Sequence, residues 1–330
     1  MVRSTKLAFT VLLLAGSCLT ASTVKHDDSL DEARRAFDAS EYTKAIQVLQ
    51  AAAAKEPTNG DIQLLLAKSY LEVQEHDAAI RSAEKAVALD PKSSLYHEWL
   101  GRAYGEKADR AGWFSAISLA KKTHKEFEIA VDLDARNFSA RQALVEFDCS
   151  APGMVGGGED KAQPHIKELL ELDAAEGHYA AGNCRRQKKD FAVADEEFTK
   201  ALENRPKSPE LIYDIGDYAA KRGQPERLIA VAEAGERVAP RDPRAKFYRA
   251  AALVLQKEKP EETENLLREY AKTAPKRSGF PSPAAAHAWL GRLYEGKNDF
   301  AGAKEEFENA LRLDPRNKIA QEELKKLKKN

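Results

Sequence analysis

The sequence predicts an all-α fold in which pairs of helices stack along one direction, and three observations indicate this architecture. First, segment 100–104 (LGRAY) returns almost unchanged as segment 290–294 (LGRLY), and each copy follows a His-x-Trp triplet. Second, prolines recur at a nearly constant interval, which is the signature of a repeat architecture. Third, charged residues make up 32% of the 330 residues and aromatic residues 8%, a composition typical of amphipathic helices.

The spacing of the prolines sets the repeat boundaries. Pro57 and Pro91 are 34 residues apart, as are Pro206 and Pro240. The last interval is lengthened by a stretch rich in Pro, Gly and Ser, residues 277–283. We therefore expect about eight helix-turn-helix repeats in residues 23–330, which start near His26, Gly60, Ser94, Asn137, Ala175, Pro209, Pro243 and Ala284 and end in a charged capping helix over residues 318–329.

Small residues recur where the two helices of a repeat should approach closely: Gly101, Gly182, Gly216 and Gly291. Together with the order Leu-Gly, Tyr, Ala, Phe and Pro in segment 290–315, they make the chain resemble the tetratricopeptide repeat family over nearly its whole length after residue 22. The resemblance implies a right-handed superhelical solenoid. It also implies a concave groove lined by the first helix of each repeat.

The N-terminus is typical of an export signal. Residues 1–22 begin with Arg3 and Lys6, continue with a ten-residue apolar run and end in small residues. The run is too short to span a bilayer, which needs about twenty residues. We expect cleavage near residue 22 and a periplasmic or extracellular protein. The alternative is a lipoprotein anchored to the membrane through Cys18, although Leu14 lies one place too early for that motif.

Cysteine use agrees with export. After removal of the signal, only Cys149 and Cys184 remain, and both are expected in first helices of neighbouring repeats. The favoured interpretation is that each thiol is a small buried apolar residue, and a disulfide in an oxidising compartment is the alternative. The two thiols lack the spacing of a zinc or redox motif.

Two insertions interrupt the third and fourth repeats. They cover residues 108–119, with Trp113 and Phe114, and the glycine-rich residues 153–158. Equivalent turns of stacked repeats are neighbours, so we expect both insertions on one edge of the solenoid, where repeat proteins often place binding loops. The favoured role of Trp113 and Phe114 is core for lengthened helices, and an exposed patch for a partner is the alternative. With these insertions the chain resembles a group of exported bacterial tetratricopeptide proteins of unknown role.

The resemblance also places particular side chains in the groove. The ninth position of the first helix carries a basic residue in three successive repeats and then acidic or polar residues, whereas the fifth position carries aromatic residues in repeats five to seven. We expect the first set to bind carboxylates of a partner, and the aromatic stripe to contact an extended peptide. The predicted groove residues are Arg34, Lys68, Arg102, Glu146, Asn183 and Asp217 at the ninth position, and Tyr179, Tyr213 and Phe247 at the fifth.

The composition and motifs exclude several classes of function. The chain without residues 1–22 has 50 basic and 53 acidic side chains (52 minus Arg3 and Lys6, against 53), a net charge of −3, which does not favour nucleic-acid binding. No catalytic, metal or cofactor motif is present. We therefore expect a non-enzymatic scaffold that binds a peptide or protein partner of unknown identity in the cell envelope. The alternatives are an envelope assembly factor anchored through Cys18 and a binder of small ligands or glycans.

Overall fold

The computed structural model describes residues 28–327 and contains seventeen α-helices, one short 3-10 helix and no strand within that range. The all-α superhelical fold expected from the sequence is confirmed. The predicted signal at residues 1–22, with Cys18, lies outside the described residues. The helices are α1 (Asp28–Asp38), α2 (Tyr42–Lys55), α3 (Gly60–Glu72), α4 (His76–Leu89), α5 (Ser94–Ala108), α6 (Trp113–Leu133), α7 (Phe138–Ser150), η1 (Gly153–Val155), α8 (Glu159–Leu172), α9 (Ala174–Gln187), α10 (Phe191–Glu203), α11 (Pro209–Arg222), α12 (Pro225–Val238), α13 (Pro243–Gln256), α14 (Pro260–Thr273), α15 (Pro283–Gly296), α16 (Phe300–Leu313) and α17 (Lys318–Leu327).

Local capping signals explain where the first helix of each repeat begins. From α3 to α15, every such helix is preceded by a side chain that accepts a hydrogen bond from a backbone N–H of the first turn. These caps satisfy donors that a helix leaves free at its start. Three of these helices also start with proline, whose fixed φ suits the first helical position. The caps are Asn59, Ser93, Asn137, Asp173, Ser208, Asp242 and Ser282.

Glycines allow the two helices of a repeat to touch. A Cβ added to Gly291 would lie 2.4 Å from the ring of Phe307, and one added to Gly182 would lie 2.7 Å from the ring of Phe198. Both rings are fully buried. The pairing of a glycine on the first helix with an aromatic ring on the second therefore fixes the distance between them.

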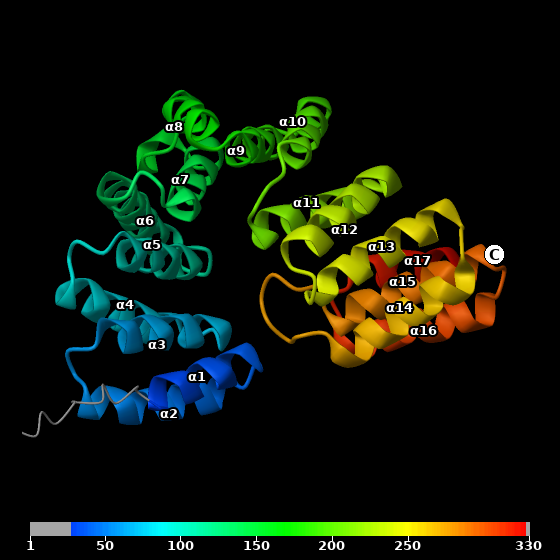
Figure 1. Ribbon diagram of the computed structural model, residues 1–330, viewed down its shortest axis with the longest axis horizontal. Helices are drawn as coiled ribbons and strands as arrows, with labels where there is room; N and C mark the ends of the chain where they lie inside the picture. The colour runs from blue at the N-terminus through cyan, green and yellow to red at the C-terminus, as the bar shows by residue number, and fades with distance from the viewer. Residues whose placement is uncertain (1–27, 328–330) are drawn as a thin grey trace, which may run out of the picture.

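The helix pairs wind through one wide turn (Figure 1). They pass from α1 and α2, through α7 to α10, to the C-terminal group α11 to α17. The loop between α14 and α15 reaches back towards α1 in the same view. This loop therefore brings the C-terminal group close to the first repeats, although most contacts along the chain join consecutive helices.

The third and fourth repeats depart from the regular pattern. Helix α6 has 21 residues, whereas α4, α8, α10 and α12 have 13 or 14. Most of the first insertion is thus helical: it lengthens α6 at its N-terminus. The second insertion forms the turn η1 between α7 and α8.

Candidate partner-binding surfaces

An apolar cavity lies between the two insertions. Its volume is about 340 Å³, and α5, α6, α7 and the η1 turn all contribute to its wall. The two insertions are therefore neighbours on one edge of the solenoid, as their positions in the repeat predicted. The cavity is lined by Gly105, Ala108, Asp109, Trp113, Ala116, Ile117, Ala120, Thr123, Phe147, Ser150, Ala151, Pro152, Met154 and Val155.

Aromatic side chains project into solvent beside this cavity. Trp113 is 70% exposed and Phe114 is 87% exposed, and Met154 on the η1 turn is exposed as well. The favoured interpretation of Trp113 and Phe114 as core for lengthened helices is therefore wrong. Helix α5 ends at Ala108, and the first turn of α6 extends past it and leaves both aromatic rings uncovered. We call the cavity with Trp113, Phe114 and Met154 the edge patch.

A hydrogen-bonded histidine supports the floor of the edge patch. His124 on α6 lies 3.1 Å from a carboxylate oxygen of Asp148 on α7, which is buried. This bond raises the pKa of His124. A Cβ added to Gly156 would lie 3.2 Å from the His124 ring, and Gly156 has a φ of 114°. Glycine is therefore required for the η1 turn to pack against α6 in this conformation.

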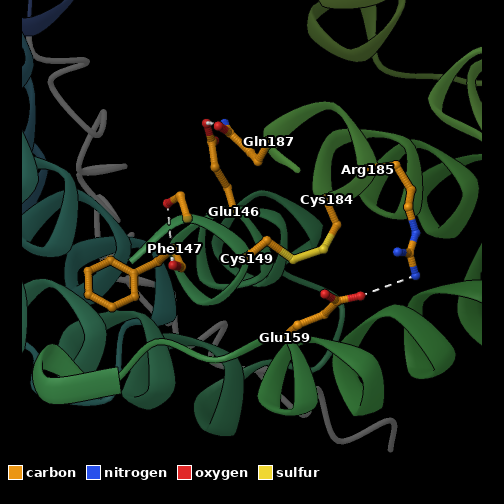
Figure 2. Close-up of a disulfide and its surroundings, with 8 residues drawn as sticks. Glu146, Phe147, Cys149, Glu159, Cys184, Arg185 and Gln187 are labelled. Atoms are coloured by element: carbon orange, nitrogen blue, oxygen red, sulfur yellow. Dashed lines mark hydrogen bonds and ion pairs between the residues drawn. A yellow bond between two sulfur atoms is a disulfide. The ribbon is translucent and has the colours of Figure 1, made fainter. Parts of the chain in front are cut away.

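A disulfide joins Cys149 on α7 to Cys184 on α9, with Cα atoms 5.3 Å apart (Figure 2). Two further contacts lie beside it: Arg185 forms an ion pair of 3.2 Å with Glu159, and Gln187 hydrogen-bonds Glu146 at 3.4 Å. Both sulfurs belong to buried residues, as expected, but the preference for two free thiols is wrong. The two cysteines lie on the neighbouring first helices α7 and α9, and their Cα atoms are at a separation that a disulfide spans.

The predicted basic residues of the groove have acidic partners within the chain. Exposed Arg34 lies 3.4 Å from Asp31 on the same helix. Arg102 donates to Glu98 at 3.0 Å and reaches across to Ser139 of the next repeat at 2.9 Å. The expected excess of positive charge on this part of the groove is therefore partly neutralised in place.

Of the three predicted basic residues, Lys68 is the one whose charge is least neutralised by acidic side chains. Among the described residues it forms no ion pair, and its Nζ lies 4.3 Å from the ring centroid of Trp99. The guanidinium of Arg102 lies 5.5 Å from the same ring, so two cations flank one indole. Burial lowers the pKa of Lys68, while the neighbouring Glu98 acts in the opposite direction. Trp99 was not among the predicted site residues.

The predicted aromatic stripe is not available to a ligand. Tyr213 is 1% exposed because its ring packs against the next repeat, and Phe247 is 2% exposed because its ring packs against the second helix of its own repeat. Tyr213 stacks on Tyr248 with ring centroids 5.7 Å apart, and Phe247 lies 4.8 Å from Tyr270. Only Tyr179 is partly exposed. The expectation that these three rings contact an extended peptide is therefore wrong for Tyr213 and Phe247.

The polar groove residues of the middle repeats also bond to neighbouring helices. Tyr179 donates its hydroxyl to Asp214 at 3.0 Å, one repeat further along. Asp217 is exposed and accepts a hydrogen bond of 2.7 Å from Tyr248. Buried Asn183 has a side-chain oxygen without a hydrogen-bond partner within the described part of the chain. These cross-repeat bonds join successive first helices and stiffen the concave face.

Glu176 is a buried carboxyl that sequence analysis missed. It is 8% exposed and accepts a hydrogen bond from Gln142 of the preceding repeat. Burial raises its pKa to about 7, and the nearby negative charge of Asp173 acts in the same direction. In an acidic, helical sequence nothing distinguished this glutamate from exposed ones.

In residues 28–327 no group of three or more His, Cys, Asp or Glu side chains has the arrangement of a metal site. Over the same residues, no helix combines the length and the apolar character that a bilayer crossing requires.

Comparisons with known proteins agree with the repeat architecture. Three family models, each described as tetratricopeptide repeat, match residues 36–102, 175–208 and 284–317. No curated protein sequence matches the chain. Among solved structures, the chain is similar to yeast Tom70, with a TM-score of 0.57 and 15% identity over 96% of this chain and 66% of that one. It is also similar to TTC0263, a tetratricopeptide protein of Thermus thermophilus, with a TM-score of 0.46 and 16% identity over 68% of this chain and 97% of that one. At 15% identity, the likeness to Tom70 shows a shared fold alone.

Proposed function

We propose that this chain, a tetratricopeptide-repeat protein, is a non-enzymatic scaffold that binds a protein or peptide partner in the cell envelope. Tetratricopeptide repeats generally serve as protein–protein interaction scaffolds, because stacking leaves long continuous surfaces free.

The edge patch carries the proposal. Exposed aromatic residues that adjoin a concave apolar cavity are costly in water and typical of binding surfaces. The cavity volume of about 340 Å³ lies at the lower end of the range for ligand pockets, roughly 300–1,000 Å³. Gly105, Ala108 and Ala120 have small side chains and leave room in the cavity. We infer that its occupant is a bulky apolar side chain of a partner, flanked by contacts to Trp113 and Phe114.

The concave face is the second surface of the proposed scaffold. Lys68, Trp99 and Arg102 form a cluster there in which one indole is flanked by two cations. An acidic segment of the partner can pair with Lys68, which has no ion pair among the described residues. The alternative of a small-ligand or glycan binder depended on the aromatic stripe, and the burial of Tyr213 and Phe247 removes its basis.

Two observations support the envelope as the compartment. Disulfides persist in secreted and periplasmic proteins and are rare in the reducing cytosol, and Cys149 and Cys184 are joined. The predicted signal at residues 1–22 points the same way. A lipid anchor on Cys18 remains the alternative form of export, and the intact mass of the mature protein distinguishes the two.

The test is affinity capture from the native envelope, followed by titration of the purified partner against variants. We expect the double variant Trp113→Ala/Phe114→Ala to weaken binding by about 30-fold or more, since aromatic residues at the centre of an interface commonly contribute that much. The matched control is Phe300→Ala, because Phe300 is also exposed and also begins the second helix of a repeat.

Two other results would change the proposal. If the double variant binds as tightly as the unmodified protein, the edge patch is not the binding surface. In that case, a loss of binding in Lys68→Glu/Arg102→Glu would place the partner on the concave face. Unchanged binding in both sets, with unchanged circular dichroism, would contradict both surfaces.

A further inference from the structure

The loop between α14 and α15, residues 274–282, contacts the opposite end of the solenoid. Arg277 lies 3.5 Å from Asp38, the last residue of α1. The backbone N–H of Ser278 donates to Glu72, the last residue of α3, at 3.3 Å. Ser278 and Glu72 are 206 positions apart in the chain, so the contact joins two distant parts of the wide turn seen in Figure 1. We call residues 274–282 the strap.

The strap is held firmly by its own end of the molecule. The guanidinium of Arg244 lies between two rings, 4.2 Å from the centroid of Tyr213 and 4.1 Å from that of Phe280. It donates to the backbone oxygen of Gly279 at 3.1 Å, and Tyr270 donates to that of Pro281 at 2.9 Å. Arg244 and Tyr270 are both buried. The strap is therefore preformed and projects from the C-terminal repeats as a fixed loop.

The opposite contact is weak. Asp38 is 73% exposed at its side chain, and an exposed ion pair of this kind changes an equilibrium by at most about fivefold. A cavity of about 340 Å³ also remains between the strap and the first repeats, and Tyr42, Glu72 and Phe280 help to line it. The closure consequently lacks the close packing that makes a contact permanent.

The chemistry of the closure is nevertheless complementary. Asp38 and Glu72 end α1 and α3, and the C-terminus of a helix carries partial negative charge in addition to these carboxylates. The strap presents to them the guanidinium of Arg277 and a backbone N–H. Since Asp38 is exposed and Arg277 and Glu72 are only partly buried, dissolved salt screens the attraction.

We propose that the strap is an electrostatic latch that closes the superhelix into a ring and opens to admit a partner to the concave face. A solenoid bends easily because each repeat contacts only its neighbours, so small rotations at several junctions separate its ends. The contacts of the strap with α13 and α14 are stronger than its contacts with Asp38 and Glu72. The strap therefore releases at Asp38 and Glu72 and remains attached to α13 and α14. The closed ring restricts entry to the concave face, and the open form exposes it along its length.

The latch is tested by charge reversal and charge exchange in the full chain. Asp38→Arg and Arg277→Asp each replace the attraction by repulsion, and the exchanged variant Asp38→Arg/Arg277→Asp restores an opposite pair. Glu32→Arg is the matched control, because Glu32 is exposed on the same helix and forms no ion pair among the described residues. Hydrogen exchange of strap amides measures opening, and small-angle X-ray scattering measures the maximum dimension of the molecule.

We expect each single reversal to speed exchange of the strap amides about tenfold and to enlarge the molecule. The exchanged variant and Glu32→Arg should behave like the unmodified protein. For the unmodified protein, 1 M NaCl should change both measurements in the same direction, with exchange of the strap amides faster by up to about fivefold, because salt removes the attraction without creating repulsion. This comparison stands even if a variant folds poorly. The proposal is overturned if strap exchange and molecular dimensions are unaffected by the reversals or by salt, or if Glu32→Arg has the same effect as Asp38→Arg.

Discussion

Removal of the Cys149–Cys184 disulfide should lower stability by an amount that the structure lets us calculate. The bond closes a loop between residues 35 positions apart, and it joins the first helices of two adjacent repeats. Cross-linking a loop of that length restricts the unfolded chain, and the polymer estimate for its stabilising effect is about 4 kcal/mol at 25 °C. We therefore expect reduction of the protein, or the double variant Cys149→Ala/Cys184→Ala, to lose free energy of unfolding of that order.

The assay is guanidinium-induced unfolding followed by circular dichroism, on oxidised protein, reduced protein and the double variant. Reduced protein keeps both buried sulfurs. The difference in free energy of unfolding between reduced protein and the double variant therefore reports the packing of those atoms. The difference between oxidised and reduced protein reports the cross-link. Hydrogen exchange should localise the loss to α7, α8 and α9, since repeats transmit stability mainly to neighbours. A change below about 1 kcal/mol on reduction, or an equal effect of the reductant on the double variant, would refute the reasoning.

Two further predictions concern a buried carboxyl and a close helix approach. Because the pKa of Glu176 is about 7 in the folded state against 4.5 for a free glutamate, its contribution to stability is present below pH 4.5 and is lost as the pH rises through 7. Glu176→Gln should therefore be more stable than the unmodified protein at pH 8, by up to about 3 kcal/mol, with no gain at pH 4; urea unfolding at both values checks this, and an equal gain at both would contradict it. Gly291→Ala should lower the melting temperature in a thermal scan, since its Cβ would lie 2.4 Å from the ring of Phe307. Gly296→Ala on the same helix meets no atom within 4 Å and should leave the melting temperature unchanged or raise it, so equal losses in both variants would argue against the steric explanation.

Local signals were sufficient to predict the fold. Prolines at a 34-residue period, a capping residue before each first helix and a glycine opposite an aromatic ring all act within one repeat, so the sequence displays them directly. The disulfide could be predicted only as an alternative to two free thiols, because the second insertion lies between Cys149 and Cys184 and hides their register along the chain.

Exposure at the proposed sites could not be predicted in the same way. Tyr213 and Phe247 occupy a position that the resemblance places in the groove, but their rings are covered by Tyr248 and Tyr270. These contacts depend on how neighbouring helices pack and not on the pattern of one helix. Trp113 and Phe114 are exposed because α6 extends past the end of α5, which depends on how many inserted residues become helical. The strap was visible only as extra length at residues 277–283, since its contact partners are far away in the sequence.

The edge patch and the strap belong to different parts of the superhelix, and this separation decides how partner binding can be interpreted. The edge patch is built by the third and fourth repeats and faces solvent whether or not the ends of the solenoid meet. The strap joins the first and last repeats, so its opening changes access to the concave face alone.

A partner held at Trp113 and Phe114 would therefore bind at a rate independent of the latch. A partner that lies along Lys68 and Arg102 would bind faster whenever the latch is open, because the ligand can engage only the competent form. Salt also screens an acidic partner directly, so the salt dependence of the association rate must be compared between the unmodified protein and Asp38→Arg. That comparison distinguishes the two surfaces.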